Sequence, residues 1–416
     1  MSDLSLQLQQ ASSQLPVSAY FDEALYAREL QTLFADGPRY VGHRLTVPEP
    51  GNFHTLPQEH QGRALVHTPK GVELISNVCR HRQALILQGR GQLEAQSGGN
   101  IVCPLHRWTY AAADPRTTGT LIGAPHFEQD PCLNLHNYPL TEWNGLLFEQ
   151  STNGRGRDIG ADLAKLGPRL DLDFEGYAFD RVELHECNYN WKTFIEVYLE
   201  DYHVGPFHPG LGSFVTCDDL RWEFGRHFSV QTVGVANRLG RAGSPVYQRW
   251  QEQLLKYRNG HPPRYGAIWL SYYPHVMVEW YPHVLTVSTL HPVGPQKTLN
   301  MVEFFYPEEI VAFEREFVEA QQAAYMETCV EDDEIAERMD AGRRALMLRG
   351  DDESGPYQSP MEDGMQQFHE WYRREMSSPP GLPTSCGRPP PAGGAAGGPA
   401  EPVPRQPSNG RAARSR

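Results

Sequence analysis

The sequence has no long apolar segment, no targeting signal and a shortage of basic residues, and each absence excludes a class of protein. No stretch approaches the roughly 18 consecutive apolar residues that a bilayer-spanning helix needs. Residues 1–16 are polar and Gln-rich, unlike a signal peptide, so we expect a cytoplasmic protein without a membrane partner. The 37 Lys and Arg against 51 Asp and Glu give a net charge of −14, which disfavours nucleic acid as a partner because its phosphates repel an acidic surface.

Cysteine is scarce, and a nucleotide-binding fingerprint is missing. The seven cysteines are odd in number and widely scattered, so we do not expect a disulfide framework. No G-x-G-x-x-G motif follows a predicted strand. The chain therefore cannot accept hydride from a nicotinamide itself, and any redox reaction that it performs needs a separate NAD(P)H-dependent reductase or a ferredoxin.

The 416 residues, 39% of them hydrophobic, are enough for two domains with cores of their own. Residues 1–37 form a predicted N-terminal helical segment with an amphipathic helix at 19–34. Residues 38–155 alternate short apolar runs with Gly, Pro and Asn, which predicts a small antiparallel β domain. Residues 156–376 mix strand and helix patterns and form the second predicted domain. Residues 377–416 are rich in Pro, Gly and Ala and lack aromatics, which predicts a disordered tail.

The second predicted domain combines one sheet with several helices. Its apolar or alternating segments predict strands at 265–273, 275–280, 285–290 and 300–306. Helical periodicity is found at 190–202, 308–348 and 361–376. The expected fold class is therefore α+β, with a small antiparallel β domain followed by an antiparallel sheet flanked by helices.

Two Cys/His pairs lie where predicted strands end. Cys79 and His81 form a C-x-H pair, and Cys103 and His106 form a C-x-x-H pair. Two thiolates and two imidazoles could hold a tetrahedral zinc ion. A C-x-H pair is a poor fit to a single tetrahedral ion, however, and suits a centre in which Cys and His bind different metals. In a Rieske [2Fe–2S] cluster two thiolates hold one iron and two imidazoles hold the other, so the spacing favours this cluster.

A second group of potential metal ligands lies in the first predicted helix of the larger domain. A helix through this segment would place Glu196, Glu200 and His203 on one face. The Gly205-Pro206 pair should end that helix and let His208 fold back toward His203. Two histidines and one carboxylate on one side of Fe(II) form a facial triad, which leaves open positions for O2 and substrate. We therefore predict a mononuclear iron site at the two histidines.

The carboxylate ligand must come from elsewhere, and the acidic segment 330–339 is the best source. Its apolar residues Ile335 and Met339 define one face of a predicted helix. Three or four residues back along that face lie Asp332 and Glu331, so either could be the ligand. Most of the other acidic residues in the segment are expected to be solvated.

These motifs resemble the Rieske non-heme iron oxygenase α subunits, the family of the aromatic-ring-hydroxylating dioxygenase large subunits, over nearly the whole predicted folded part. The Cys/His pairs resemble the Rieske domain of that family. Asn190-Trp191-Lys192, followed by the spacing of His203 and His208, resembles its iron-site signature. Two positions depart from the pattern, because Gln83 and Arg107 stand where the family usually has Gly.

The resemblance implies a START-like, helix-grip catalytic domain, a [2Fe–2S] cluster, a mononuclear Fe(II), and a homotrimer that uses O2 and a small organic substrate. It places the carboxylate ligand at Asp332. It also implies that a carboxylate three residues before the first iron histidine links that histidine to a cluster histidine of the next subunit. This residue is Glu200, where most members have Asp, and Asp201 is the alternative. Glu at this position is similar to carnitine and related quaternary-ammonium monooxygenases.

The substrate is open between two chemical classes. The resemblance predicts mono- or dioxygenation of an aromatic or related small molecule. Aromatic residues in the predicted strands could instead enclose a quaternary ammonium through cation–π contact, or they could simply pack the core. They are Trp222, Trp269, Tyr272, Tyr273, Trp280 and Tyr281. The first interpretation indicates a carnitine-, choline- or betaine-type monooxygenase or an N-demethylase. A third possibility, a Rieske electron-transfer protein without catalysis, would need only the first domain and no second metal site.

Overall fold

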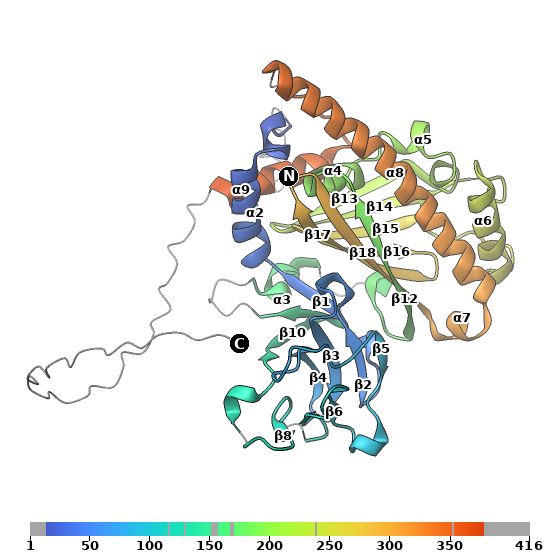
Figure 1. Cartoon of the computed structure of the whole chain (residues 1–416). Coiled ribbons are helices and arrows are strands. Elements are labelled where there is room, and N and C mark those ends of the chain that lie inside the picture. The colour runs from blue at the N-terminus through green and yellow to red at the C-terminus, as the bar shows by residue number, and fades with distance from the viewer. Residues whose placement is uncertain are drawn as a thin grey trace, which may run out of the picture. The chain divides into compact units, whose positions relative to one another are not determined.

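Small antiparallel sheets in the first part of the chain precede a larger antiparallel sheet and its helices (Figure 1). The computed structural model describes residues 14–114, 117–128, 130–150, 157–166, 170–237, 239–351 and 353–377. All of these residues belong to one compact unit. The predicted domain boundaries stay predictions, and the predicted tail lies outside the described residues beyond its first residue.

Three small sheets contain the Cys/His pairs, with strand orders β1-β11-β10, β5-β2-β3-β4-β9 and β6-β7-β8. Their strands are β1 (Arg39–His43), β2 (Asn52–Thr55), β3 (Arg63–Thr68), β4 (Gly71–Ser76), β5 (Arg90–Gln92), β6 (Ile101–Val102), β7 (Thr109–Tyr110), β8 (Leu121–Gly123), β9 (Asn137–Tyr138), β10 (Leu140–Trp143) and β11 (Leu146–Glu149). Short apolar runs separated by turn residues form these strands, as the sequence predicts.

The larger sheet has seven antiparallel strands in the order β12-β18-β17-β16-β15-β14-β13. Its strands are β12 (Tyr177–Cys187), β13 (Val215–Phe224), β14 (Phe228–Val235), β15 (Ala267–Tyr272), β16 (Val276–Tyr281), β17 (Val284–Gly294) and β18 (Lys297–Pro307). The four predicted strands are β15 to β18, and they are neighbours in one sheet. The predicted α+β class, with small antiparallel sheets followed by an antiparallel sheet flanked by helices, is confirmed.

The two faces of the seven-stranded sheet contact different parts of the chain, because successive side chains of a strand point to opposite faces. On one face Leu270, Val278 and Val287 pack in one core with Tyr40 and Phe148 of the small sheets. This face is called the inner face below. The strands β14 to β17 are buried along most of their length, so the sheet is covered on both sides.

The opposite face, called the cavity face below, packs against helices. Trp269 and Phe304 share a core with Trp250 of α6 and Phe317 of α8. The α-helices are α2 (Glu23–Glu29), α3 (Ile159–Asp162), α4 (Trp191–Tyr198), α5 (Val204–Phe207), α6 (Pro245–Tyr257), α7 (Glu308–Phe313), α8 (Arg315–Arg349) and α9 (Asp363–Ser377). The long helix α8 crosses the sheet (Figure 1), and Gly350 ends it in a left-handed conformation with φ of 78°. None of the helices in the described ranges is long and apolar enough to cross a membrane.

Two helix predictions near the N-terminus and the iron histidines are wrong in extent. The helix predicted at 19–34 consists of a 3₁₀ turn (Val17–Tyr20), α2 and a π-helical stretch (Leu30–Ala35). The helix predicted at 190–202 ends at Tyr198, because the next segment leaves the helical path and the backbone N–H of Asp201 donates to the carbonyl of Met361 at 3.1 Å. The Gly205-Pro206 pair lies inside the short α5 and does not end a helix.

Candidate functional site

The two Cys/His pairs lie in loops with the same backbone hydrogen bonds. The N–H of Cys79 donates to the carbonyl five residues later at 2.9 Å, and the N–H of Cys103 does the same at 2.8 Å. In each loop the N–H four residues after the cysteine donates to the cysteine carbonyl, at 3.1 Å in both. The two loops therefore present their side chains from matching frames, although the histidine is two residues after the first cysteine and three after the second.

The two departures from the family pattern occupy equivalent positions in these frames. Gln83 has a φ of 55° and Arg107 a φ of 59°. Each is the fourth residue after its cysteine and donates the N–H described above. A left-handed backbone favours glycine because glycine has no Cβ to clash with the following carbonyl. The geometry thus explains why a loop of this kind usually carries Gly there.

Thiols and imidazoles from the two loops meet at the tip of the small sheets. Cys79 and Cys103 are each 2% exposed. The His81 ring lies 4.7 Å from the His106 ring and stacks on Trp108 at 4.8 Å with 8° between the planes. Nδ1 of His81 is buried and has no hydrogen-bond partner in the described part of the chain. Two thiols, two imidazoles and an orphaned ring nitrogen fit a [2Fe–2S] centre of mixed Cys and His ligation.

His203, His208 and Asp332 converge on one point. Nε2 of His208 lies 3.0 Å from Nε2 of His203 and 2.9 Å from Oδ1 of Asp332. Oδ1 of Asp332 lies 3.4 Å from Nε2 of His203, so the three atoms could bind one metal ion. The triad geometry predicted from the sequence is present, although His203 precedes the short α5 and does not belong to the α4 helix.

A carboxylate contacts the Nδ1 atom of each imidazole, the ring nitrogen that does not face Asp332. Nδ1 of His203 is hydrogen-bonded to Glu200, and Nδ1 of His208 contacts Oε2 of Glu331 at 2.7 Å. A ring proton on Nδ1, where the carboxylate accepts it, leaves the Nε2 lone pair directed at Asp332. Burial favours the neutral ring, but hydrogen bonds to Asp332 and Glu200 raise the pKa of His203 to about 10. The surroundings therefore strongly favour a positive charge at this point, as a metal ion would supply.

Neighbouring acids of α8 point in different directions, which separates the ligand candidates. Asp332 faces Nε2 of both histidines, whereas Glu331 contacts Nδ1 on the other side of the His208 ring. Asp333 binds Tyr189 and His185, at 2.8 and 2.7 Å. The sequence did not identify Glu331 as a supporting residue, because helix phase cannot tell which nitrogen of a ring an adjacent acid will reach.

Asp201, the alternative to Glu200, does not contact the imidazole of His203. It is 3% exposed and accepts a hydrogen bond from the side-chain amide of Gln231. Burial raises the pKa of Asp201 to about 7. The structure therefore favours Glu200 as the acid that supports His203.

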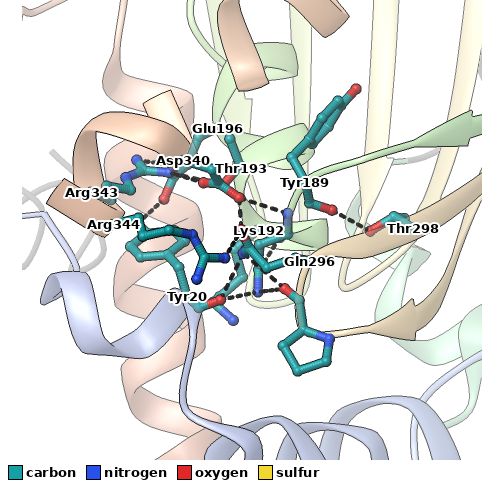
Figure 2. A network of polar contacts seen from close by, with 12 residues as sticks. Tyr20, Tyr189, Lys192, Thr193, Glu196, Gln296, Thr298, Asp340, Arg343 and Arg344 are labelled. Atoms are coloured by element: carbon teal, nitrogen blue, oxygen red, sulfur yellow. Dashed lines mark hydrogen bonds and ion pairs between the residues drawn. The ribbon is translucent and has the colours of Figure 1, made fainter. Parts of the chain in front are cut away.

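Polar contacts join the segment that begins α4 to α8 (Figure 2). The backbone N–H of Asn190 donates to Asp340 at 2.9 Å, and the hydroxyl of Thr193 donates to the same carboxylate at 2.6 Å. Arg343 bridges Thr193 at 2.8 Å and Glu196 at 2.5 Å. Asp340 lies about two helical turns beyond the metal-facing acid of α8. Glu196 thus belongs to this network and not to the metal site.

The other two residues of the Asn190-Trp191-Lys192 motif tie α4 to α2. The indole N–H of Trp191 donates to Glu29 at 2.9 Å, and Nζ of Lys192 lies 2.7 Å from the same carboxylate. Both charged side chains are fully buried, and burial lowers the pKa of Lys192 although Glu29 opposes the shift. The motif therefore has a structural role. Removing either Lys192 or Glu29 would leave the charge of the other buried without a partner.

A cavity opens between the cavity face of the sheet, α4 and α8, and the metal-facing triad lines it. Its empty volume is about 960 Å³ with the open mouth included. The lining is rich in aromatic residues, with Tyr198, Phe214, Tyr247, Trp250, Trp269, Tyr281 and Tyr325 among them. The cavity can therefore hold a small organic substrate next to the triad.

Two of the six aromatic residues proposed as a cation cage line this cavity. They are Trp269 and Tyr281. The other four pack elsewhere, as the core-packing alternative predicts: Tyr272 and Trp280 belong to the inner-face core, and Tyr273 and Trp222 to a third core beside α9. Core packing, the other interpretation of these residues, therefore holds for four of the six.

Glu279 of β16 is a cavity residue that the sequence analysis missed. It is 1% exposed, and burial raises its pKa to about 7. Tyr325 and Tyr281 each donate a hydroxyl to it at 3.1 Å. The only signal in the sequence is a single acid within the apolar run of residues 276–281, which a buried strand rarely contains without a reason.

Comparisons with known proteins agree with both metal-binding regions. Residues 39–139 match the model of the Rieske [2Fe-2S] domain, and residues 174–378 match the model of the ring hydroxylating alpha subunit (catalytic domain). The chain is 65% identical over 378 residues to putrescine 2-hydroxylase of Ralstonia nicotianae, covering 90% of this chain and all of the relative. It is 62% identical to putrescine 2-hydroxylase of Bordetella bronchiseptica, covering 88% of this chain and 85% of the relative.

A solved structure with the same fold belongs to the quaternary ammonium Rieske monooxygenase CntA. The TM-score is 0.70 over 90% of this chain and 98% of the other, at 19% identity. At this identity the similarity concerns the fold alone. The match of a catalytic domain after the cluster-binding domain excludes an electron-transfer protein made of the first domain only.

Proposed function

Because this chain belongs to the Rieske non-heme iron oxygenase α subunits, we propose that it is the terminal oxygenase that hydroxylates putrescine or a close aliphatic diamine. The observation that carries the proposal is the 65% identity to a putrescine 2-hydroxylase along that relative's entire length. The reaction inserts one oxygen atom of O2 into a C–H bond, and two electrons and two protons reduce the other atom to water.

The relatives change the substrate expected from the sequence. Neither putrescine 2-hydroxylase is named for an aromatic substrate or for dioxygenation, so an aromatic ring is not the substrate we propose. A quaternary ammonium, the second expectation, shares positive charge with a diamine but differs in having no N–H. The buried acid Glu279, surrounded by aromatic side chains of the cavity lining, supports a cationic substrate.

We assign the cluster to Cys79, His81, Cys103 and His106, and the mononuclear iron to His203, His208 and Asp332. When bound, the cluster supplies single electrons and the iron activates O2. The residues of the chain orient these groups: Trp108 stacks on one cluster imidazole, and Glu200 and Glu331 fix the tautomers of the iron imidazoles.

Electrons must come from a separate NAD(P)H-dependent reductase or ferredoxin, as is typical of this family. We further propose that Glu200 is the electron bridge between subunits of a homotrimer. Its side chain is partly exposed and already supports His203. The longer Glu in place of the usual Asp retains the hydrogen bond to the imidazole, so the bridge does not require Asp at this position.

The test is a substrate panel with the purified, iron-loaded chain, a reductase and NADPH. We expect O2 uptake and a hydroxylated product with putrescine, and neither carnitine nor naphthalene should give product. Product from carnitine or from an arene, without product from any aliphatic diamine, would reject the proposal. Because the same preparation is used throughout, a competent electron supply is verified by whichever substrate reacts.

A further inference from the structure

Glu279 and Asp201 are the two acids of the cavity that form no ion pair with a basic side chain. The acidic residues that line the cavity are Glu200, Asp201, Glu279, Asp332 and Asp333. All except Asp201 and Glu279 contact a histidine. Asp201 is bonded to Gln231, and the nearby charge of His203 lowers its pKa in part. In the described part of the chain no Lys, Arg or His forms an ion pair with Glu279, and the largest causes of its pKa shift are burial and hydrogen bonds from hydroxyl groups.

The hydrogen bonds around Glu279 leave the carboxylate able to accept more. Tyr325 donates to Oε1 and Tyr281 donates to Oε2, each at 3.1 Å. The indole N–H of Trp269 donates to the Tyr281 oxygen at 3.0 Å, so the single proton of Tyr281 is directed to the carboxylate. Each carboxylate oxygen can accept about two hydrogen bonds. These two hydrogen bonds leave one acceptor position on each oxygen, and the buried hydroxyls of Tyr198 and Thr286, which have no other partner in the described part of the chain, lie close enough to compete with a ligand for it.

Aromatic rings form the walls around this acid. Trp269 is its direct cross-strand neighbour, and its ring centroid lies 6.2 Å from that of Tyr281 and 6.3 Å from that of Tyr198. The ring of Tyr325 is 6.1 Å from Tyr281 and nearly perpendicular to it, at 87°. A buried anion without a counter-ion is costly. A cation bound here would offset that cost and would also face the electron-rich rings.

Resting on the proposed diamine hydroxylation, we propose that Glu279 binds one terminal primary ammonium of the substrate and so selects primary amines over quaternary ones. A –NH3⁺ group has three N–H donors for the free acceptor positions of the carboxylate. A quaternary ammonium has none and carries three methyl groups in their place. A site built to receive hydrogen bonds discriminates strongly against a ligand that lacks them.

The first test compares Glu279→Gln with the wild-type enzyme for putrescine. The substitution keeps the shape and removes the charge, so we expect the KM to rise by roughly 30-fold or more, the usual cost of removing one partner of a buried charge pair. Iron content and the cluster spectrum should not change. Glu303→Gln is the matched control, because Glu303 is also buried and bonded to a tyrosine but lies outside this cavity, and its KM should equal that of the wild type.

The second test uses Glu279→Asp, which keeps the charge but withdraws it by one methylene. We expect the ratio of kcat/KM for 1,5-diaminopentane over that for putrescine to rise, because the longer diamine compensates for the shorter acid. The bis(trimethylammonium) analogue of putrescine should not compete for the wild-type site.

The outcomes separate this inference from the proposed function. A wild-type enzyme that hydroxylates putrescine, together with an unchanged KM in Glu279→Gln, overturns the inference and leaves the function intact. Competition by the bis(trimethylammonium) analogue as strong as that by putrescine overturns the selection of primary amines. A wild-type enzyme that hydroxylates no diamine rejects the proposed function itself.

Discussion

Glu279 and Glu303 are the same residue type in the same sheet, and the two faces of that sheet give them different surroundings. Both are buried, at 1% and 2% exposure, and burial raises the pKa of each to about 7. Tyrosine hydroxyls bind both, Tyr325 and Tyr281 at Glu279 and Tyr40 at Glu303. Glu303 faces the small sheets, whereas Glu279 faces the cavity.

Strand register alone separates the two acids. Glu279 pairs with Thr286, whose other neighbour is Phe304. Glu303 is one residue before Phe304 and pairs with Val287. A shift of one residue moves a side chain to the opposite face. The comparison teaches that a buried, unpaired acid indicates a function only when the face that it occupies is known.

The largest effect is expected from replacing a metal ligand that lines the cavity. Replacing Asp332 by Ala removes one of three converging donors, so bound iron and hydroxylation should be lost, well beyond the roughly 100-fold that an outer partner contributes. Iron analysis with an unchanged cluster spectrum measures this. The neighbouring Asp333→Asn is the control and should retain iron, because Asp333 is bonded to His185 and Tyr189. Full iron content in Asp332→Ala would disprove the ligand assignment.

Replacing Glu303, the buried acid of the inner face, should change the pH dependence of stability and not the KM for substrate. The pKa of Glu303 is raised from 4.5 to about 7 in the folded chain, so the folded state holds a proton that the unfolded state releases. Stability should therefore fall as pH rises from 4.5 to 7, by roughly 3 kcal/mol for this group. Glu303→Gln should lose this slope, and its advantage over the wild type should grow with pH across that window.

Urea unfolding of both proteins at several pH values measures the effect on the inner face. Glu316→Gln provides a control, since Glu316 is exposed and its removal should leave the slope unchanged. An equal pH slope in Glu303→Gln and wild type would show that Glu303 ionises in the folded chain as it does in the unfolded one.

A smaller effect is expected from the acid behind His208. Glu331→Gln keeps the shape but weakens the hold on Nδ1 of His208, now at 2.7 Å. Loss of such a partner typically lowers metal affinity by about 10- to 100-fold. Iron titration against a chelator should show this drop, whereas Glu334→Gln, at an exposed position of the same helix, should not. Identical affinities in both variants would remove Glu331 from the site.

The smallest effect is expected from a substitution in the loops that carry the Cys/His pairs, which lie outside the large sheet. Gln83 has a φ of 55°, and Gly at that position should relieve a strain of roughly 1 kcal/mol. Gln83→Gly should therefore raise the thermal stability of the cluster-loaded protein. The same change at Gln88, an exposed position outside the left-handed set, should destabilise it or have no effect.

Local features of the chain were predictable, whereas features that depend on long-range packing were not. The Cys/His loops follow from spacing, because only a short turn separates each cysteine from its histidine. His203 and His208 meet although the predicted helix was wrong, because the chain between them forms one helical turn in which the N–H of Phe207 donates to the carbonyl of His203. Helix phase left both Glu331 and Asp332 as ligand candidates, and the two acids contact different nitrogens of His208.

The acid of the cavity could not be recognised from its own segment. Residues 276–281 and 300–306 both show one Glu in an apolar strand, and only the register of β17 with its neighbours β16 and β18 decides which Glu faces the cavity. The choice between a cage and core packing for the aromatic residues stayed open for the same reason. Tyr272 and Trp280 are adjacent in sequence to cavity-facing positions, but they belong to the other face.

Product analysis with putrescine and ¹⁸O2 tests the central claim most directly. The iron-loaded enzyme with a reductase and NADPH should convert putrescine to a monohydroxylated diamine that carries one ¹⁸O atom, and Asp332→Ala should form none. Putrescine recovered unchanged, while the same preparation oxygenates a carnitine-type or aromatic compound, would contradict the account.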